Sequence, residues 1–138
     1  MLSELYKNHC ERASDINELL PILKEYASKV DRVTEFGVRT GCSTVAFLNS
    51  SAKQVVSYDI DDCEVAHYLK TLAPDRFTFI REDTSKIFNI AETDMLFIDT
   101  LHTYEQVKNL QYHVAQRSLC NQGLLLRLLQ KLEHFFVG

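Results

Sequence analysis

Hydrophobic and polar residues follow two different periods along this chain. In the N-terminal segment, apolar residues recur at the three- and four-residue spacing of an amphipathic helix. Pro21 suits the first turn of such a helix, and Asp15 with Glu18 has the spacing of a capping box. We therefore expect N-terminal helices over residues 1–30 that form a lid or cover a sheet.

Short apolar segments then alternate with helical ones over residues 31–116. The expected strands are rich in β-branched and aromatic residues and span Arg32–Phe36, Gln54–Tyr58, Phe77–Ile80 and Met95–Ile98. The expected helices span Ser43–Ser50, Asp62–Leu72 and Thr103–Gln116, with a short turn near Ser85–Phe88. Strands that alternate with helices predict right-handed crossovers and a parallel sheet, and hence an α/β fold.

Residues 117–138 fit two alternatives. Gly123 and the leucines after it have the composition of a fifth strand, whereas apolar residues from Leu125 to Phe136 form a helical stripe. We favour a divergent C-terminal helix within a single domain of 138 residues. Its leucine-rich stripe offers a surface to a second copy of the chain, so a homo-oligomer is one expectation.

The composition and charge of the chain limit the classes of partner that it can have. Hydrophobic residues make up 46% and charged residues 25% of the chain, as in an ordinary globular domain. The net charge of −4 gives no electrostatic case for nucleic acid, and no apolar run is long enough to span a membrane. The four cysteines lack metal-type spacing, so we expect a reduced, cytoplasmic protein. Cys42 is interpreted as a packing residue, since no His or Asn partner lies nearby in the sequence.

Each expected strand ends in polar residues that include a carboxylate. The carboxylates at the four strand ends are Glu35, Asp59 with Asp61, Glu82 with Asp83, and Asp99. Ligands of open parallel sheets bind beyond the carboxyl ends of the strands, so these groups predict a binding edge. Crowded carboxylates repel one another unless ligands or cations offset the repulsion. A single Asp after a strand is also common as a turn or cap residue.

The segment after the first strand has the pattern E-x-G-x-x-x-G-x-S. Gly37 and Gly41 allow a ligand to lie against bare main chain, and Ser43 and Thr44 are typical N-cap residues. A helix N-terminus binds carboxylates, and Glu35 adds an acceptor beside the first glycine. The pattern suits an adenosine-bearing ligand with an amino group. An ordinary strand-to-helix turn is the alternative interpretation.

Four segments in this order resemble the class I S-adenosylmethionine-dependent methyltransferases. The resemblance is greatest to the metal-dependent O-methyltransferases of the catechol O-methyltransferase type and their small-molecule and sugar-modifying relatives. The segments are E-F-G-V-R-T-G-C-S-T, S-Y-D-I-D, R-E-D-T and D-M-L-F-I-D-T-L-H-T-Y-E, within residues 30–116. The resemblance implies a Rossmann-like doubly wound sheet with strand order 3-2-1-4, a possible fifth strand and S-adenosylmethionine as cofactor.

The resemblance also implies residue roles. Asp59, with Ile60 beside it, would bind the ribose hydroxyls, and Asp83 and Thr84 would lie near the adenine. The remaining cofactor-binding residues would come from the first motif: Glu35, Gly37, Gly41, Ser43 and Thr44. For Asp59, a helix cap is the alternative.

The fourth motif implies the catalytic residues. Asp99 matches the position that ligates a divalent metal such as Mg²⁺ in the metal-dependent members, and His102 falls at a catalytic or substrate-facing position. A neutral His can accept the proton of a small-molecule hydroxyl. A surface residue at a helix start is the alternative for His102. The other histidines show no partner pattern: His9, His67, His113 and His134.

The resemblance stops near residues 115–117. No further ligands follow where the metal site would be completed, and Asp99 alone is a poor Mg²⁺ site. We therefore expect a C-terminally shortened, incomplete version of the fold. A non-catalytic cofactor-binding or interaction domain is the alternative to an active methyltransferase. A nicotinamide-dependent reductase is less favoured because the G-x-G-x-x-G spacing is missing.

Overall fold

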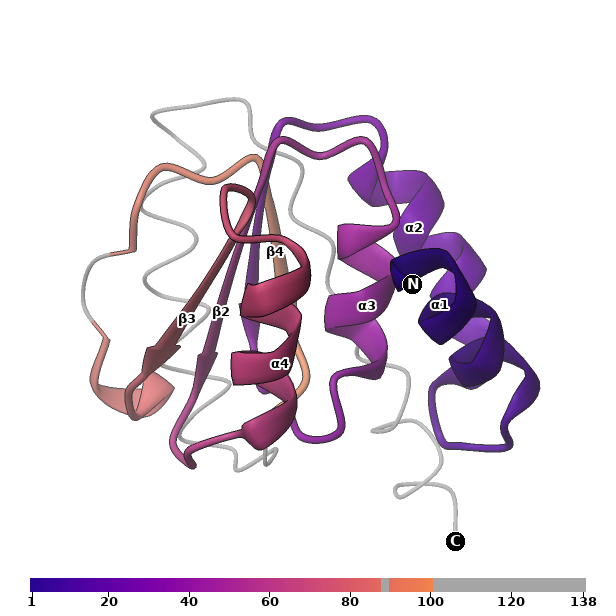
Figure 1. The fold of residues 1–138 in the computed structure, drawn as a ribbon. Coiled ribbons are helices and arrows are strands. Elements are labelled where there is room, and N and C mark those ends of the chain that lie inside the picture. The colour runs from indigo at the N-terminus through magenta and orange to yellow at the C-terminus, as the bar shows by residue number, and fades with distance from the viewer. Residues whose placement is uncertain (88–89, 101–138) are drawn as a thin grey trace, which may run out of the picture.

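The computed structural model describes residues 1–87 and 90–100, which form a four-stranded sheet with helices on one face (Figure 1). Its N-terminal part comprises α1 (Leu2–Glu11), the 3₁₀ helix η1 (Asn17–Leu19) and α2 (Leu20–Ala27). The elements that follow are β1 (Arg32–Phe36), α3 (Cys42–Leu48), β2 (Gln54–Asp59), α4 (Glu64–Leu72), β3 (Phe77–Arg81), the 3₁₀ helix η2 (Thr84–Lys86) and β4 (Met95–Ile98).

The strands are ordered β3-β2-β1-β4, and every neighbouring pair is parallel. This order confirms the predicted Rossmann-like sheet. The chain moves outward from β1 through β2 to β3 and then returns to the other side of β1 for β4. The direction reverses between β1 and β4, which is the switch point where such sheets bind ligands. The possible fifth strand, the expected helix Thr103–Gln116 and the C-terminal helix of 117–138 lie outside the described residues.

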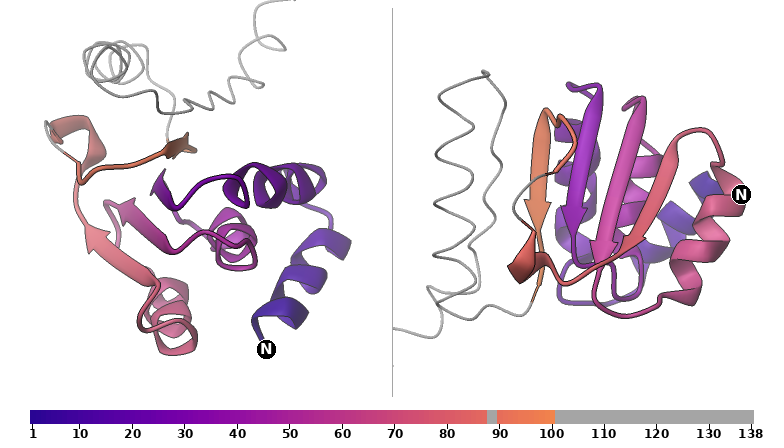
Figure 2. Two further views of the ribbon diagram at one scale, coloured as in Figure 1. Left: turned by 90° about the horizontal axis from the view of Figure 1, so that it is seen from above. Right: turned by 90° about the vertical axis from the view of Figure 1, so that its left-hand side faces the viewer.

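The two faces of the sheet carry different side chains because residues alternate along each strand. Toward the helices, Val33, Val55 and Phe77 pack into a core with Leu23 and Phe47. Figure 2 shows α1 to α4 together on this side of the sheet. Complete burial of such a side chain stabilises the fold by about 1.5–3 kcal/mol.

The opposite face holds a second, smaller cluster. Phe36, Tyr58 and Leu96 are buried there, and the Phe36 and Tyr58 rings meet edge-on with centroids 5.4 Å apart. The sheet therefore has apolar side chains on both faces, as a doubly wound fold requires.

Most predicted boundaries agree with the structure to within two residues. β1 and β4 match the prediction, β2 and β3 are each one residue longer, and α4 begins two residues later, at Glu64. Pro21 lies in the first turn of α2, as predicted. Among the described helices, none has both the length and the apolar character needed to cross a bilayer.

The predicted capping box at Asp15 and Glu18 is wrong. The helical segment there begins as η1, whose N-cap is Ile16, and no side chain caps it. The nearby turn is instead held by Ser14, whose Oγ accepts a hydrogen bond from Asn17 N at 3.0 Å. Asp15 faces the glycine loop after β1, where it forms an ion pair described below.

Candidate functional site

The four strand ends meet at one edge of the sheet. Backbone hydrogen bonds continue the sheet past the strand ends and join each end to its neighbour. They run from Gly37 N to Tyr58 O, from Glu82 N to Asp59 O and from Asp99 N to Phe36 O, each 2.8 Å long. The polar residues that follow the strands are therefore brought together, as the α/β alternation predicts.

Gly37 and Asp99 touch at the switch point between β1 and β4. Gly37 has φ +95°, and a Cβ atom there would lie 2.2 Å from the carbonyl oxygen of Asp99. Only glycine allows both this backbone conformation and this close approach. The main chains of the two strand ends are thus packed directly against each other.

The Asp59 side chain joins the glycine loop (residues 37–41) to the end of β2 through hydrogen bonds. Its Oδ2 accepts hydrogen bonds from Val38 N at 2.8 Å and Arg39 N at 3.2 Å, and its Oδ1 accepts one from Asp61 N at 3.0 Å. Burial raises the pKa of Asp59, but these backbone donors outweigh that effect and hold the pKa below its usual value. The helix-cap alternative for Asp59 is wrong, because the N-cap of α4 is Cys63 and no side chain caps that helix.

Glu35 lies beneath the loop and is completely buried. Its Oε1 accepts a hydrogen bond from Ser43 Oγ, and its Oε2 accepts bonds from Thr44 Oγ1 at 2.7 Å and Ser57 Oγ at 2.6 Å. Burial raises the pKa of Glu35 to about 7, although the three hydroxyl donors lower it. The negative charge of Asp99 raises it further.

The expectation that Ser43 or Thr44 caps the helix is wrong. The N-cap of α3 is Gly41, whose φ of +78° lies in the left-handed region. Ser43 and Thr44 are inside the first turn, buried, with their hydroxyls turned inward to Glu35. The hydrogen bonds among these three side chains therefore stabilise the buried side of the loop. Their direct contact with a ligand stays a prediction.

Ser57 is a site residue that sequence reasoning missed. Glu35 and Ser57 are partners in the parallel register of β1 and β2, so their side chains leave the same face side by side. The register of the strand pair is the signal that would have found Ser57. A lone serine in an apolar strand does not reveal that register.

The remaining predicted cofactor residues follow β2 and β3. Ile60 is 59% exposed beside Asp59, and Arg81 Nε donates a hydrogen bond to its carbonyl oxygen at 3.2 Å. Asp83 caps η2, with Oδ1 accepting a hydrogen bond from Ser85 N at 3.0 Å. The hydrogen bonds from Ser85 hold the pKa of Asp83 below its usual value. Thr84 is buried.

The described residues do not fit a metal ion. Within residues 1–87 and 90–100, no group of three or more His, Cys, Asp or Glu side chains is placed to hold one. Asp99 alone offers too few oxygens for Mg²⁺. His102 lies outside the described residues, so its catalytic role stays a prediction.

The N-terminal segment contacts the glycine loop and the start of α3, and sequence reasoning missed both contacts. Arg39 Nη1 pairs with Asp15 Oδ2 at 3.3 Å, and Cys42 Sγ lies 3.2 Å from His9 Nδ1. Cys42 therefore does have a histidine partner, which comes from α1. The two residues are far apart in the sequence, so spacing gave no sign of the contact.

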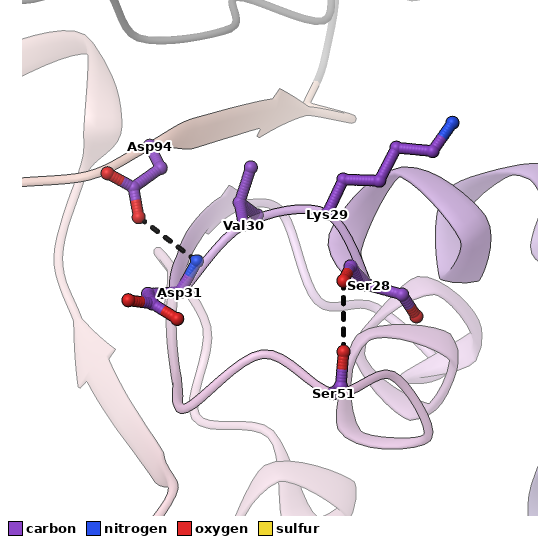
Figure 3. Close-up of a pocket in the computed structure, with 6 residues that line it drawn as sticks. All are labelled: Ser28, Lys29, Val30, Asp31, Ser51 and Asp94. Carbon is purple, nitrogen blue, oxygen red and sulfur yellow. Dashed lines mark hydrogen bonds between the residues drawn. The ribbon is translucent and has the colours of Figure 1, made fainter.

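A shallow pocket lies at the opposite edge of the sheet, beside the amino end of β1 (Figure 3). Asp94 Oδ2 accepts a hydrogen bond from Asp31 N there at 3.2 Å, and Ser51 Oγ donates one to Ser28 O at 2.9 Å. This pocket contains none of the predicted site residues. Its lining residues are Ser28, Lys29, Val30, Asp31, Ser51 and Asp94.

The sheet order and the glycine loop at the switch point define a Rossmann-like domain of the methyltransferase type. A family model described as a methyltransferase domain matches residues 34–126, which is more than half of the chain. The chain therefore belongs to this methyltransferase domain family.

One solved structure with a similar fold is the crystal structure of the SAH-bound Podospora anserina methyltransferase PaMTH1. The two chains are 18% identical, with a TM-score of 0.55. The match covers 82% of this chain and 56% of that one, so this chain spans little more than half the length of its structural neighbour. No curated protein matches the chain.

Proposed function

We propose that the chain binds S-adenosylmethionine at the carboxyl edge of the sheet and supports the transfer of its methyl group to an acceptor. The observation that carries this proposal is the glycine loop at the switch point, packed against Asp99 and fastened by the Asp59 carboxylate. Family membership supports it. The similar Podospora anserina methyltransferase is described as SAH-bound, and SAH is the product that S-adenosylmethionine leaves after methyl transfer.

The residues at this edge suit the parts of an adenosine-bearing ligand. Asp59 accepts two backbone hydrogen bonds at Oδ2 and one at Oδ1, so Oδ1 is the oxygen that would accept a ribose hydroxyl. The exposed Ile60 side chain offers an apolar surface to the adenine ring, with Asp83 and Thr84 on the next strand end. Glu35 keeps the loop in place through its buried hydroxyl contacts.

We further propose O-methyl transfer to a small-molecule or sugar hydroxyl. When bound, the cofactor supplies a methyl group already activated on a sulfonium, so the protein mainly aligns the reactants. His102 would accept the proton of the acceptor hydroxyl as the new oxygen–carbon bond forms, and Asp99 would orient that hydroxyl. No step of this proposal passes through a metal ion.

Isothermal titration with S-adenosylhomocysteine tests the binding proposal. We expect Asp59→Ala to weaken binding by about 1–3 kcal/mol, because it removes a hydrogen bond to the ribose and the anchor of the loop. Asp61→Ala is the matched control, since Asp61 contributes its backbone N–H rather than its carboxylate to these contacts. An unchanged affinity in Asp59→Ala would show that the second motif is misassigned.

An analogue that lacks the ribose 2′-hydroxyl separates the two roles of Asp59. If the carboxylate binds that hydroxyl, Asp59→Ala should weaken binding of the analogue less than it weakens binding of S-adenosylhomocysteine. Binding of NAD in place of S-adenosylhomocysteine would favour the reductase alternative. Cofactor binding without turnover of catechol or sugar acceptors would favour the non-catalytic alternative.

A further inference from the structure

The contact between α1 and the start of α3 brings a thiol and an imidazole together. Cys42 Sγ lies 3.2 Å from His9 Nδ1 and 3.3 Å from Thr40 Oγ1. Cys42 and His9 are both partly exposed. Neither residue belongs to the proposed cofactor contacts, but Cys42 directly follows Gly41 of the glycine loop.

The surroundings of His9 favour its neutral form. Burial, together with the positive charge of Arg12, lowers the pKa of His9 below its usual value. A neutral imidazole has a nitrogen lone pair that can accept the thiol proton of Cys42. A thiol beside such a base is the arrangement that generates a nucleophilic thiolate.

The other described thiols lack this arrangement. Cys63 is buried, and burial together with the nearby Asp59 charge raises its pKa to about 11. Cys10 is partly exposed, but its side-chain partner is the hydroxyl of Tyr6, which is no base at neutral pH. Cys10 therefore serves as an internal reference for a thiol of similar exposure.

We propose that Cys42 and His9 form a nucleophilic pair that reacts with small disulfides, such as glutathione disulfide. This reaction would control cofactor binding at the carboxyl edge of the sheet. The thiol proton passes to His9 Nδ1, and Cys42 Sγ forms a bond to one sulfur of the disulfide as the sulfur–sulfur bond of the reagent breaks. The released thiolate takes up a proton from His9. Cys42 is oxidised to the mixed disulfide, and the other half of the reagent leaves as a thiol.

The adduct occupies the contact that joins α1 to the start of α3, directly after the glycine loop. It replaces the thiol at the residue after Gly41 with a bulky group, which must push α1 or the start of α3 aside. Because that loop carries the cofactor contacts, this control rests on the proposed function. We expect the adduct to weaken binding of S-adenosylhomocysteine.

Peptide mass spectrometry of the full chain treated with glutathione disulfide tests the pair itself. We expect Cys42 to react faster than Cys10, and His9→Asn and His9→Ala each to slow the reaction at Cys42 about tenfold. Asn can keep a hydrogen bond to the thiol but is no base, so it separates proton acceptance from positioning. His67→Asn is the matched control, because His67 pairs with Asp62 instead, and it should leave the rate unchanged.

A rate at Cys42 no higher than at Cys10, or an unchanged rate in His9→Asn, would overturn the proposal. Titration with S-adenosylhomocysteine then tests whether the adduct at Cys42 weakens cofactor binding. The adduct should lower the affinity of the wild type at least tenfold, and the same treatment of Cys42→Ala should not. Equal affinity with and without the adduct would refute the control, whereas no binding by untreated protein would refute the proposed function and leave the reactivity result standing.

Discussion

Glu35 shows at the scale of one residue how the site is built. A carboxyl group at the centre of a sheet is costly to bury unless hydrogen bonds replace its lost water. Three hydroxyls supply those bonds, from Ser43, Thr44 and Ser57. The sequence predicted Glu35 as an acid at the loop. Its hydroxyl partners were not predictable, because they depend on the register of β1 with β2 and on the position of Ser43 and Thr44 in the first turn of α3.

The raised pKa of Glu35 makes stability depend on pH. The folded state holds this proton up to about pH 7, whereas an unfolded chain releases it near the ordinary value of 4.5. Folded protein therefore binds more protons in this range, and the contribution of Glu35 to the free energy of unfolding falls as pH rises from 4.5 through 7. Gln resembles the protonated acid, so the free energy of unfolding of Glu35→Gln should not fall in this way. Above pH 7 it should be about 3 kcal/mol higher than that of the wild type.

Urea unfolding of both proteins from pH 4 to 8 measures this difference. We expect their free energies of unfolding to be similar near pH 4 and to diverge as pH rises. A difference between the two that does not change with pH would contradict the raised pKa of Glu35.

The glycine loop is the element on which the site depends. Its two glycines were predicted from the sequence, but the reasons for them differ. At Gly37 a Cβ would meet the Asp99 backbone, whereas at Gly41 it would lie 3.0 Å from Cγ2 of the Val65 side chain. The Asp99 backbone, which is hydrogen-bonded to Phe36 O at the end of β1, has less freedom to move than a side chain at the start of α4.

Alanine substitutions should therefore differ in their effects. We expect Gly37→Ala to lower the free energy of unfolding by about 3 kcal/mol or more, through backbone strain and the clash with Asp99. Gly41→Ala should lower the free energy of unfolding by only about 1–2 kcal/mol. The left-handed φ remains unfavourable for alanine, but the Val65 side chain can shift to make room. Thermal and urea unfolding would rank the two, and an equal or reversed order would contradict the close packing of β1 against β4.

The architecture of the described part of the molecule was largely predictable from the sequence. Short β-branched strands alternating with amphipathic helices predicted the parallel sheet, and the motif resemblance predicted its order. Contacts between distant parts of the chain were not predictable in this way. Ser57 with Glu35, His9 with Cys42, and Asp15 with Arg39 are joined by strand register and helix packing, which leave no periodic signal in one sequence.

The central claim is that a sulfonium nucleoside binds at the carboxyl edge of the sheet, at the β1–β4 switch point. Hydrogen exchange measured with and without saturating S-adenosylhomocysteine tests it most directly. We predict slower exchange at residues 37–41 and 59–61, with no change at residues 28–31 and 51 around the pocket at the amino edge. Protection confined to the amino edge, or none in the glycine loop of a protein that binds the compound, would contradict the account.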